Sequence, residues 1–440
     1  MLLGTQRLND RDHLEIGGCD TVELAERFGT PLYVMDEQLI RDNCRKYLAA
    51  FGKRYPRVKV PYAGKAFLTM AMARIIQEEG LCLDVASGGE LYTALEAGFP
   101  ADRLVLHGNN KSEEELTLGL QSGVGRIVAD SVFELEMLDR LTRELGRDVS
   151  ILLRTKPGID PHTHRRIQTG QEDSKFGLGI KTGEALEAIK LALTLPRVKL
   201  TGIHCHIGSQ LLHLDTHLDA IQILVDFMKE VQDATGATLD EVNVGGGVGI
   251  RYLPEHQPPS IDEFAERLIG TLEQRLEESG LPRPVLEVEP GRSIVGEAGT
   301  TLYRVGGLKD IEIPKEPGRR IYVNIDGGMS DNPRPQLYEA VYSCALANRS
   351  SGSETRTVTI AGKHCETDIL IWDTSVLLPR PGDLLAVQST GAYNYAMASN
   401  YNRLPRPAVV LVKDGQADLI VQRETYQDLI RQDRIPTRLT

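Results

Sequence analysis

Three short stretches of this 440-residue sequence hold residue types that could do chemistry at one bound cofactor. Lys65 follows a β-rich run and has small neighbours, so its amine could reach a cofactor without crowding it. Gly245-Gly246-Gly247 could cradle a phosphate, because glycine lets backbone N–H groups approach an anion. Glu289 and Arg292 flank a Pro-Gly turn. Each stretch also has a simpler interpretation. Lys65 could be a solvated surface lysine, the three glycines could form a tight turn, and Glu289 could form a local salt bridge with Arg292.

Histidine and cysteine residues raise the possibility of a metal site. His204-Cys205-His206 and His162-x-His164 contain suitable ligand types. Successive side chains of a strand face opposite sides, so Cys205 would point away from both neighbouring histidines. We therefore predict no metal. His206 at the strand tip is better placed to stack on an aromatic cofactor, and His204 to be a hydrogen-bonded barrel histidine.

These residues fall at the ends of predicted strands. From about residue 57 to 291, β-rich runs alternate with amphipathic helical segments, which predicts βαβ units and a parallel sheet. The expected strands are Val58–Ala63, Leu81–Ala86, Leu104–His107, Arg126–Ala129, Val149–Arg154, Leu200–His206, Glu241–Val244 and Val285–Glu289. Eight strands indicate a (β/α)8 barrel, whose active site lies at the carboxyl ends of its strands. Ser112 and Ser131 are expected to be helix caps.

The pattern changes after Gly299. Helical periodicity fades, and β-branched runs separated by Pro/Gly-rich segments predict a β-sandwich or small β-barrel. The extended stretch Pro31–Val34 suggests that the N-terminal segment joins this sheet. We therefore expect a barrel over residues 36–299 and a β domain built from both termini, residues 1–35 and 300–440.

Composition sets the broad class of the protein. Hydrophobic residues make up 41% and charged residues 25%, which is ordinary for a soluble globular protein. A net charge of −12 argues against a nucleic-acid partner, and no apolar run is long enough to cross a membrane. The six cysteines are scattered without Cys-x-x-Cys pairs, and no signal peptide is visible. We expect a cytoplasmic protein with reduced thiols.

The three stretches together fit one cofactor. Pyridoxal phosphate needs a Schiff-base lysine, a carboxylate on its pyridinium nitrogen and a phosphate site. Lys65, Glu289 and the glycine run supply all three at strand ends of one predicted barrel.

The sequence resembles the barrel-type, pyridoxal-phosphate-dependent amino-acid decarboxylases, and among them the diaminopimelate decarboxylase family. The resemblance runs from about residue 30 to 407. Its motifs are Tyr62–Ala66, Asp84–Leu91, His107–Lys111, His162–His164, Ser174–Leu178, His204–Gln210, Glu289–Arg292, Arg334-Pro335 with Tyr338, Cys365–Asp368 and Gly391–Tyr393. So many motifs in the same order argue strongly against chance similarity.

The resemblance implies a role for each matching residue. Lys65 would bind the cofactor covalently, His206 would stack on its ring and Glu289 would pair with its ring nitrogen. The remaining cofactor contacts would come from Asp84, Ser209, Gly245, Gly246, Gly247, Gly291, Arg292 and Tyr393.

The resemblance also implies the substrate and the assembly. The family decarboxylates meso-2,6-diaminopimelate to L-lysine and CO2, the last step of lysine biosynthesis. Substrate contacts would come from Arg292, Arg334, Tyr338, Glu366 and Tyr393. Cys365 would donate a proton from the neighbouring subunit, which implies a homodimer with shared active sites.

The sequence departs from the family pattern at two places. Lys363-His364 precedes Cys365 where many members carry Gly-Pro, and the segment after Tyr338 lacks a histidine often found there.

Three other functions remain as alternatives. A decarboxylase of the same fold could act on ornithine, arginine or carboxynorspermidine, but such substrates have no distal carboxylate for the arginines to hold. Racemisation would need a second base, for which we find no tyrosine motif. A non-catalytic, cofactor-carrying relative is the third alternative, and the retention of Lys65 and Cys365 argues against it.

Overall fold

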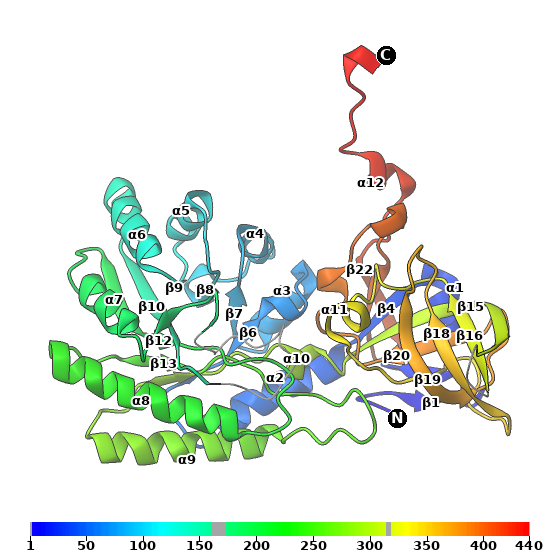
Figure 1. Cartoon of the computed structure of the whole chain (residues 1–440), viewed down its shortest axis with the longest axis horizontal. Helices are drawn as coiled ribbons and strands as arrows, with labels where there is room; N and C mark the ends of the chain where they lie inside the picture. Colours follow the sequence, from blue (N-terminus) through cyan, green and yellow to red (C-terminus); the bar gives the residue numbers. More distant parts are fainter. Residues whose placement is uncertain (1, 160–172, 314–317, 440) are drawn as a thin grey trace. The chain divides into compact units, whose positions relative to one another are not determined.

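The computed structural model describes residues 2–159, 173–313 and 318–439, and it divides into two compact units (Figure 1). The barrel unit contains Arg41–Ile250 and His256–Ile294. The β unit contains Met1–Ile40, Arg251–Glu255 and Val295–Thr440. The units thus divide a few residues inside the expected positions 36 and 299, and the short segment 251–255 joins the β unit, which the sequence did not indicate. The histidine pair at 162 and 164 lies outside the described residues.

The barrel unit has the predicted eight-stranded parallel sheet. Its first strand is interrupted at Val60 into β5 and β6; β5 pairs with β14 and β6 pairs with β7, so the sheet closes on itself. The strands are β5 (Val58–Lys59), β6 (Pro61–Ala63), β7 (Cys82–Val85), β8 (Leu104–Leu106), β9 (Arg126–Ala129), β10 (Val149–Lys156), β12 (Val198–His204), β13 (Glu241–Asn243) and β14 (Val285–Glu287), with β11 (Leu178–Gly179) beside β10. The predicted barrel fold is confirmed.

Helices alternate with these strands (Figure 1). They are α2 (Glu37–Gly52), α3 (Met70–Glu78), α4 (Gly88–Glu96), α5 (Glu113–Ser122), α6 (Val132–Leu145), α7 (Glu184–Ala192), α8 (Asp215–Thr235), α9 (Ile261–Ser279) and the short α10 (Arg292–Val295). Ser112 and Ser131 cap α5 and α6, as predicted, and Ser87 caps α4. Each hydroxyl accepts a hydrogen bond from a backbone N–H that the helix leaves unpaired, which fixes where the helix begins.

A charged layer crosses the barrel interior. Arg126 and Glu241 open β9 and β13, and Arg126 Nε and Nη2 donate to Glu241 at 2.8 and 2.6 Å. Lys59 Nζ donates to Glu241 at 3.0 Å and to Glu287 at 3.2 Å. Burial opposes the charge of Glu241, but Arg126 and Lys59 outweigh it and lower the pKa of Glu241 to about 2. Two cations therefore balance two buried carboxylates.

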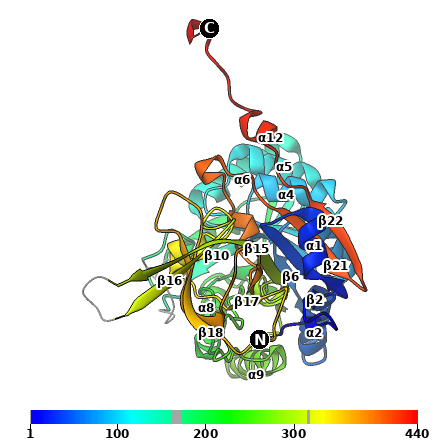
Figure 2. The same cartoon turned by 90° about the vertical axis from the view of Figure 1, so that its right-hand side faces the viewer.

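The β unit is organised around the long strand β15 (Gly299–Glu312). It pairs antiparallel with β4 (Leu32–Asp36), β16 (Arg319–Ile325) and β20 (Leu384–Gln388). β4 also pairs with β21, so the N-terminal segment joins this sheet and the predicted β domain is confirmed. The other strands are β1 (Arg7–Leu8), β2 (Leu14–Ile16), β3 (Cys19–Asp20), β17 (Cys344–Leu346), β18 (Thr355–Ala361), β19 (Ile369–Leu377), β21 (Ala408–Lys413) and β22 (Gln416–Val421). Figure 2 faces this unit.

Short helices complete the β unit: α1 (Thr21–Phe28), α11 (Arg334–Tyr338) and α12 (Tyr426–Ile430). Its core contains the fully buried side chains of Leu32, Val34, Leu302 and Val410 from β4, β15 and β21. These strands therefore form the packed core from which the loops of the β unit extend. Among the described residues, no helix has both the length and the apolar character needed to cross a bilayer.

Candidate active site

Lys65 lies in a single 3-10 turn, Gly64–Ala66, immediately after β6. Its side chain is exposed at the carboxyl end of the barrel strand. Burial raises the pKa of Asp84 to about 6, a rise that the nearby charges of His107 and Lys65 oppose. Burial also lowers the pKa of His206 well below its usual range, and the charge of Lys65 lowers it further. Lys65 thus stands close to Asp84 and to an imidazole that stays neutral.

Glu289 is the centre of the buried polar cluster. Asn243 Nδ2 donates to its Oε1 at 2.7 Å, and His204 Nε2 lies 3.2 Å from its Oε2. His107 Nε2 lies 3.0 Å from Oε1 as a charge contact. Burial opposes the charge of Glu289, but His107 and His204 outweigh it, so the pKa of Glu289 falls well below its usual range. Glu289 is therefore an ionised carboxylate in a water-poor site.

The pKa values of the two histidines shift in opposite directions. Burial lowers the pKa of His204 to about 4, so this ring is neutral. Burial also opposes the charge of His107, but Asp84 and Glu289 outweigh it and raise the pKa of His107. The rings meet edge to face, with centroids 4.9 Å apart. His204 is the hydrogen-bonded barrel histidine that the sequence predicted. His107 was named only as the last residue of an expected strand and as part of a family motif, without a role.

Asn243 was missed by the sequence analysis. Besides Glu289, its Nδ2 donates to Glu287 at 3.1 Å, and its Oδ1 accepts from Gly245 N at 2.8 Å. It thus connects the carboxylate to the glycine turn. The available signal was alternation: Glu241, Asn243 and Gly245 are two residues apart and point to one face of β13 and its extension.

Two N–H groups of the glycine run, those of Gly245 and Gly246, already donate hydrogen bonds within the protein. Gly245 N donates to Asn243, and Gly246 N donates to His206 Nδ1 at 3.3 Å. A Cβ at Gly246 would lie 2.1 Å from the carbonyl oxygen of Glu289, and Gly245 and Gly247 have φ of 69° and 120°. The glycines are thus required by close backbone approach and by conformation. The expectation of free N–H groups does not hold for the first two.

Arg292 and Ser209 come together beside this turn. Arg292 is buried at the start of α10, and its Nη2 donates to Ser209 Oγ at 2.9 Å. A Cβ at Gly291 would lie 3.0 Å from the Cβ of Ala63, so this turn packs against the strand that leads to Lys65. A guanidinium and a hydroxyl side by side suit an anion such as a phosphate or carboxylate.

The sequence argued against a metal site at the triplet 204–206, and His204 and His206 have different hydrogen-bond partners in the structure. β12 ends at His204, and Cys205 is buried with its pKa raised by burial to about 12. His204 instead turns to His107 and Glu289, and the polar atoms of these three lie within 4.8 Å of one another, a spacing that a metal ion could also use. The absence of a metal remains a prediction.

In the β unit, three predicted residues gather at α11. The guanidinium of Arg334 lies 5.3 Å from the ring centre of Tyr338 and 5.6 Å from that of Tyr393. Burial opposes the charge of Arg334, but nearby tyrosines including Tyr252 and Tyr342 outweigh it and raise its pKa. Arg334 Nε is buried and makes no hydrogen bond within the described parts of the chain. A buried, permanently charged donor of this kind suits a carboxylate ligand.

Cys365 and Glu366 lie on a different part of the β unit, in the loop between β18 and β19. Cys365 is exposed, and its backbone N donates to Asn402 Oδ1 at 3.0 Å. Tyr401 donates its hydroxyl to Glu366 Oε1 at 2.6 Å. The loop is thus fixed by Tyr401 and Asn402, and it leaves the side chains of Cys365 and Glu366 exposed at the surface.

Comparison with known proteins agrees with this geometry. Residues 39–296 match the family model described as "Pyridoxal-dependent decarboxylase, pyridoxal binding domain". The chain is 48% identical to the diaminopimelate decarboxylase of Bacillus subtilis (strain 168) over 98% of each chain, and 45% identical to that of Mycobacterium tuberculosis (strain H37Rv) over 94% and 93%. This chain belongs to the diaminopimelate decarboxylase family.

Solved structures agree as well. The chain matches the diaminopimelate decarboxylase of M. jannaschii in complex with L-lysine with a TM-score of 0.92 and 37% identity, covering all of both chains. The protein is thus a pyridoxal-phosphate-dependent decarboxylase. The barrel residues fit this cofactor: an exposed lysine, an ionised buried carboxylate and an Arg–Ser pair follow different strands of one barrel, after their carboxyl ends.

The protonation pattern suits the pyridine ring. A carboxylate has about four accepting positions; Asn243 donates to Glu289 and His204 Nε2 lies within hydrogen-bond distance of it, whereas His107 Nε2 makes a charge contact without a hydrogen bond among the described residues, so Glu289 keeps accepting capacity for a ring N–H. Because Glu289 is ionised, it favours the protonated ring nitrogen. When bound, pyridoxal phosphate supplies an electron sink for the bonding electrons that a departing carboxylate leaves behind.

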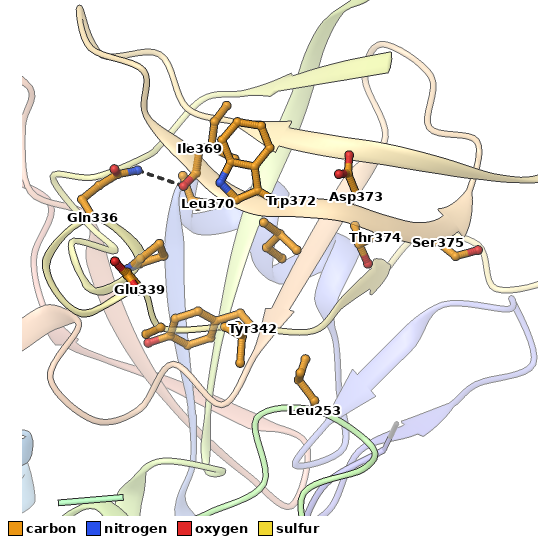
Figure 3. Close-up of a pocket in the computed structure, with 14 residues that line it drawn as sticks. Leu253, Gln336, Glu339, Tyr342, Ile369, Leu370, Trp372, Asp373, Thr374 and Ser375 are labelled. Carbon is orange, nitrogen blue, oxygen red and sulfur yellow. Dashed lines mark hydrogen bonds between the residues drawn. The ribbon is translucent and has the colours of Figure 1, made fainter. Parts of the chain in front are cut away.

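This decarboxylase also has a cavity of about 540 Å³ within its β unit, between α11 and β19 (Figure 3). Its lining includes Leu253, Glu339, Tyr342, Trp372 and Asp373. None of the predicted site residues line it, so we assign it no role in catalysis.

Proposed function

We propose that this enzyme decarboxylates meso-2,6-diaminopimelate to L-lysine and CO2. The observation that carries the proposal is the buried Arg334, whose Nε faces no hydrogen-bond acceptor in the described chain and whose guanidinium lies near Tyr338 and Tyr393. Diaminopimelate has a second amino-acid centre that stays intact, and an arginine can hold its carboxylate. The names of the relatives and the lysine complex of the M. jannaschii enzyme support the same substrate.

In the barrel, we assign Lys65 to the covalent attachment of the cofactor and Glu289 to its ring nitrogen. His206 is neutral and flat, which suits stacking on an uncharged face of the ring. Asp84 stands next to Lys65 and His107, where it can balance their charges. Anion contacts are assigned to Ser209, Gly247, Gly291 and Arg292, on the support of the Arg292–Ser209 pair. Gly245 and Gly246, whose N–H groups are already bonded, are assigned to the tight turn that brings these groups to the cofactor.

In the β unit, we assign Arg334, Tyr338 and Tyr393 to substrate contacts and Glu366 to the distal ammonium group. The carbon that loses its carboxylate must take up one proton, and a thiol can act as the general acid. Cys365 is assigned to that role. As in the family pattern, Cys365 would serve the site of the neighbouring subunit, so we expect the working unit to be a homodimer. We expect the enzyme to be cytoplasmic. We thus assign the cofactor contacts to the barrel residues and these substrate contacts to residues of the β unit.

The test is CO2 release by the purified protein with pyridoxal phosphate. Meso-diaminopimelate, ornithine, arginine and carboxynorspermidine are offered separately, and the product is identified. We expect release from meso-diaminopimelate alone, with lysine as product. Release only from another amino acid would refute the roles of Arg334 and Glu366. Sedimentation at several protein concentrations tests the dimer, and a monomer with full turnover would contradict it.

A further inference from the structure

Asp368, at the end of the loop that carries Cys365 and Glu366, accepts hydrogen bonds from residues at the start of the same loop. Gly362 N donates to the Asp368 carbonyl at 2.7 Å, and His364 N donates to Asp368 Oδ2 at 3.1 Å. Asp368 has φ of 43°, a left-handed conformation that costs free energy for a residue with a side chain. Such strain persists only where surrounding contacts fix it, so the loop is held in one shape.

The Asp368 carboxylate is buried and accepts three hydrogen bonds. Two come from His364, from its backbone N and from its ring Nδ1 at 2.6 Å, and the third comes from Met329 N at 2.8 Å. A Cβ at Gly362 or Gly328 would lie 1.9 or 2.2 Å from Asp368 Oδ2. Only glycine at these two positions leaves room for the carboxylate. The space that holds the Asp368 carboxylate is therefore formed by two chain segments, one containing Gly362 and the other containing Gly328.

The second segment leads directly to Arg334. Lys363 N donates to the Gly327 carbonyl at 3.0 Å, and Asn332 N donates to the Gly328 carbonyl at 2.8 Å. Two residues further on, α11 begins with the buried Arg334. Asp368 therefore fastens the Cys365 loop to the segment that positions Arg334.

His364 extends this connection to the far side of the loop. Its ring is buried, and its Nε2 makes no hydrogen bond in the part of the chain that the structure describes. The ring stacks on Tyr401, with centroids 5.9 Å apart and planes 12° apart. Tyr401 in turn donates to Glu366, and its neighbour Asn402 accepts from Cys365 N. Asp368, His364 and Tyr401 thus hold both functional residues of the loop.

We propose that Asp368 and His364 are positioning residues for the decarboxylation. They fix the Cys365–Glu366 pair and couple its placement to that of Arg334. The inference rests on the proposed function, because it takes Cys365 as the proton donor and Arg334 and Glu366 as substrate contacts. Without Asp368 and His364, Cys365 would no longer be held where the proton is needed, and misplacement by about 1 Å can cost about 100-fold in rate.

The test compares D368N with D373N. Both aspartates have a left-handed backbone, at φ of 43° and 44°, which asparagine tolerates, but Asp373 is exposed and lies outside the cluster. In D368N, the new amide would turn an NH2 toward one of the three donors. We expect D368N to bind pyridoxal phosphate normally, with kcat lowered about 100-fold and KM raised. D373N should match wild type in both constants.

A second pair of variants examines His364. H364N keeps a donor where ring Nδ1 stands, whereas H364F keeps only a flat ring against Tyr401. We expect H364N to retain more of the wild-type kcat than H364F. Equal kcat values for the two variants would overturn the role of the His364–Asp368 hydrogen bond.

Amide hydrogen exchange gives a readout that needs no substrate. In D368N, the segments 327–334 and 362–368 should both exchange faster than in wild type, and in D373N neither should. Wild-type exchange in both segments would overturn the proposal whatever the substrate proves to be. Lower thermal stability of D368N with wild-type kcat and KM would overturn it too. If the wild type acts on another amino acid, the same variants are compared on that substrate. A wrong substrate assignment is then distinguished from a wrong assignment of Asp368 and His364 as positioning residues.

Discussion

Replacing Glu289 by glutamine should separate its charge from its shape. The amide has nearly the same size, but it has one oxygen where the carboxylate has two. Asn243, His204 and His107 all present nitrogen atoms to Glu289 at 2.7 to 3.2 Å. Glutamine would therefore leave at least one of them facing an NH2 group, and the ring nitrogen of the cofactor would lose its anionic partner.

The size of the effect follows from these contacts. Removing one preorganised electrostatic contact at a reacting centre costs about 3–4 kcal/mol, which corresponds to about 100- to 1000-fold in kcat. A buried donor left without an acceptor costs a further amount of about 1–3 kcal/mol in the free energy of unfolding. We therefore expect E289Q to fold with reduced stability and to lose most of its turnover.

The assay is CO2 release at saturating substrate and pyridoxal phosphate, with unfolding by urea measured on the same samples. E241Q is the matched control, since it makes the same chemical change in the charged layer of the barrel. It should lose stability but keep the kcat of the folded enzyme. A wild-type kcat for E289Q, or an equal loss of kcat in E241Q, would refute the role of the Glu289 charge.

Three further outcomes are expected. Lys65→Ala should fold but lose the near-visible absorbance of the lysine-bound cofactor; an unchanged spectrum removes Lys65 from this role. Cys365→Ala should fold and bind cofactor yet lose most turnover in the CO2 assay, and wild-type turnover would reassign the proton donor. Glu241 has a folded-state pKa of about 2 against 4.5 when unfolded, so its contribution of about 3 kcal/mol is present above pH 4.5 and is lost as pH falls toward 2. The stability gap between E241Q and wild type in urea should shrink over that range, and a constant gap would contradict it.

Much of the fold could be predicted from the sequence because its signals are local. β-rich runs alternate with amphipathic segments, and the serine caps Ser112 and Ser131 mark where helices begin. Strand ends then located Lys65 and Glu289 at one face of a barrel. The boundaries between the two units were harder to predict from the sequence. The segment 251–255 belongs to the β unit because of its tertiary contacts, which no sequence pattern indicates.

The sequence by itself determined the barrel, the β domain and the residue types of a pyridoxal phosphate site, because these depend on periodicity and on order along the chain. Only the tertiary structure decided which side chains meet. His107 and Asn243 reach Glu289 because barrel closure brings separate strands to one interior layer. Asp368 joins the Cys365 loop to the Arg334 segment because two glycines leave space for one carboxylate. Side-chain direction and close backbone approach depend on the packed fold, and periodicity carries neither.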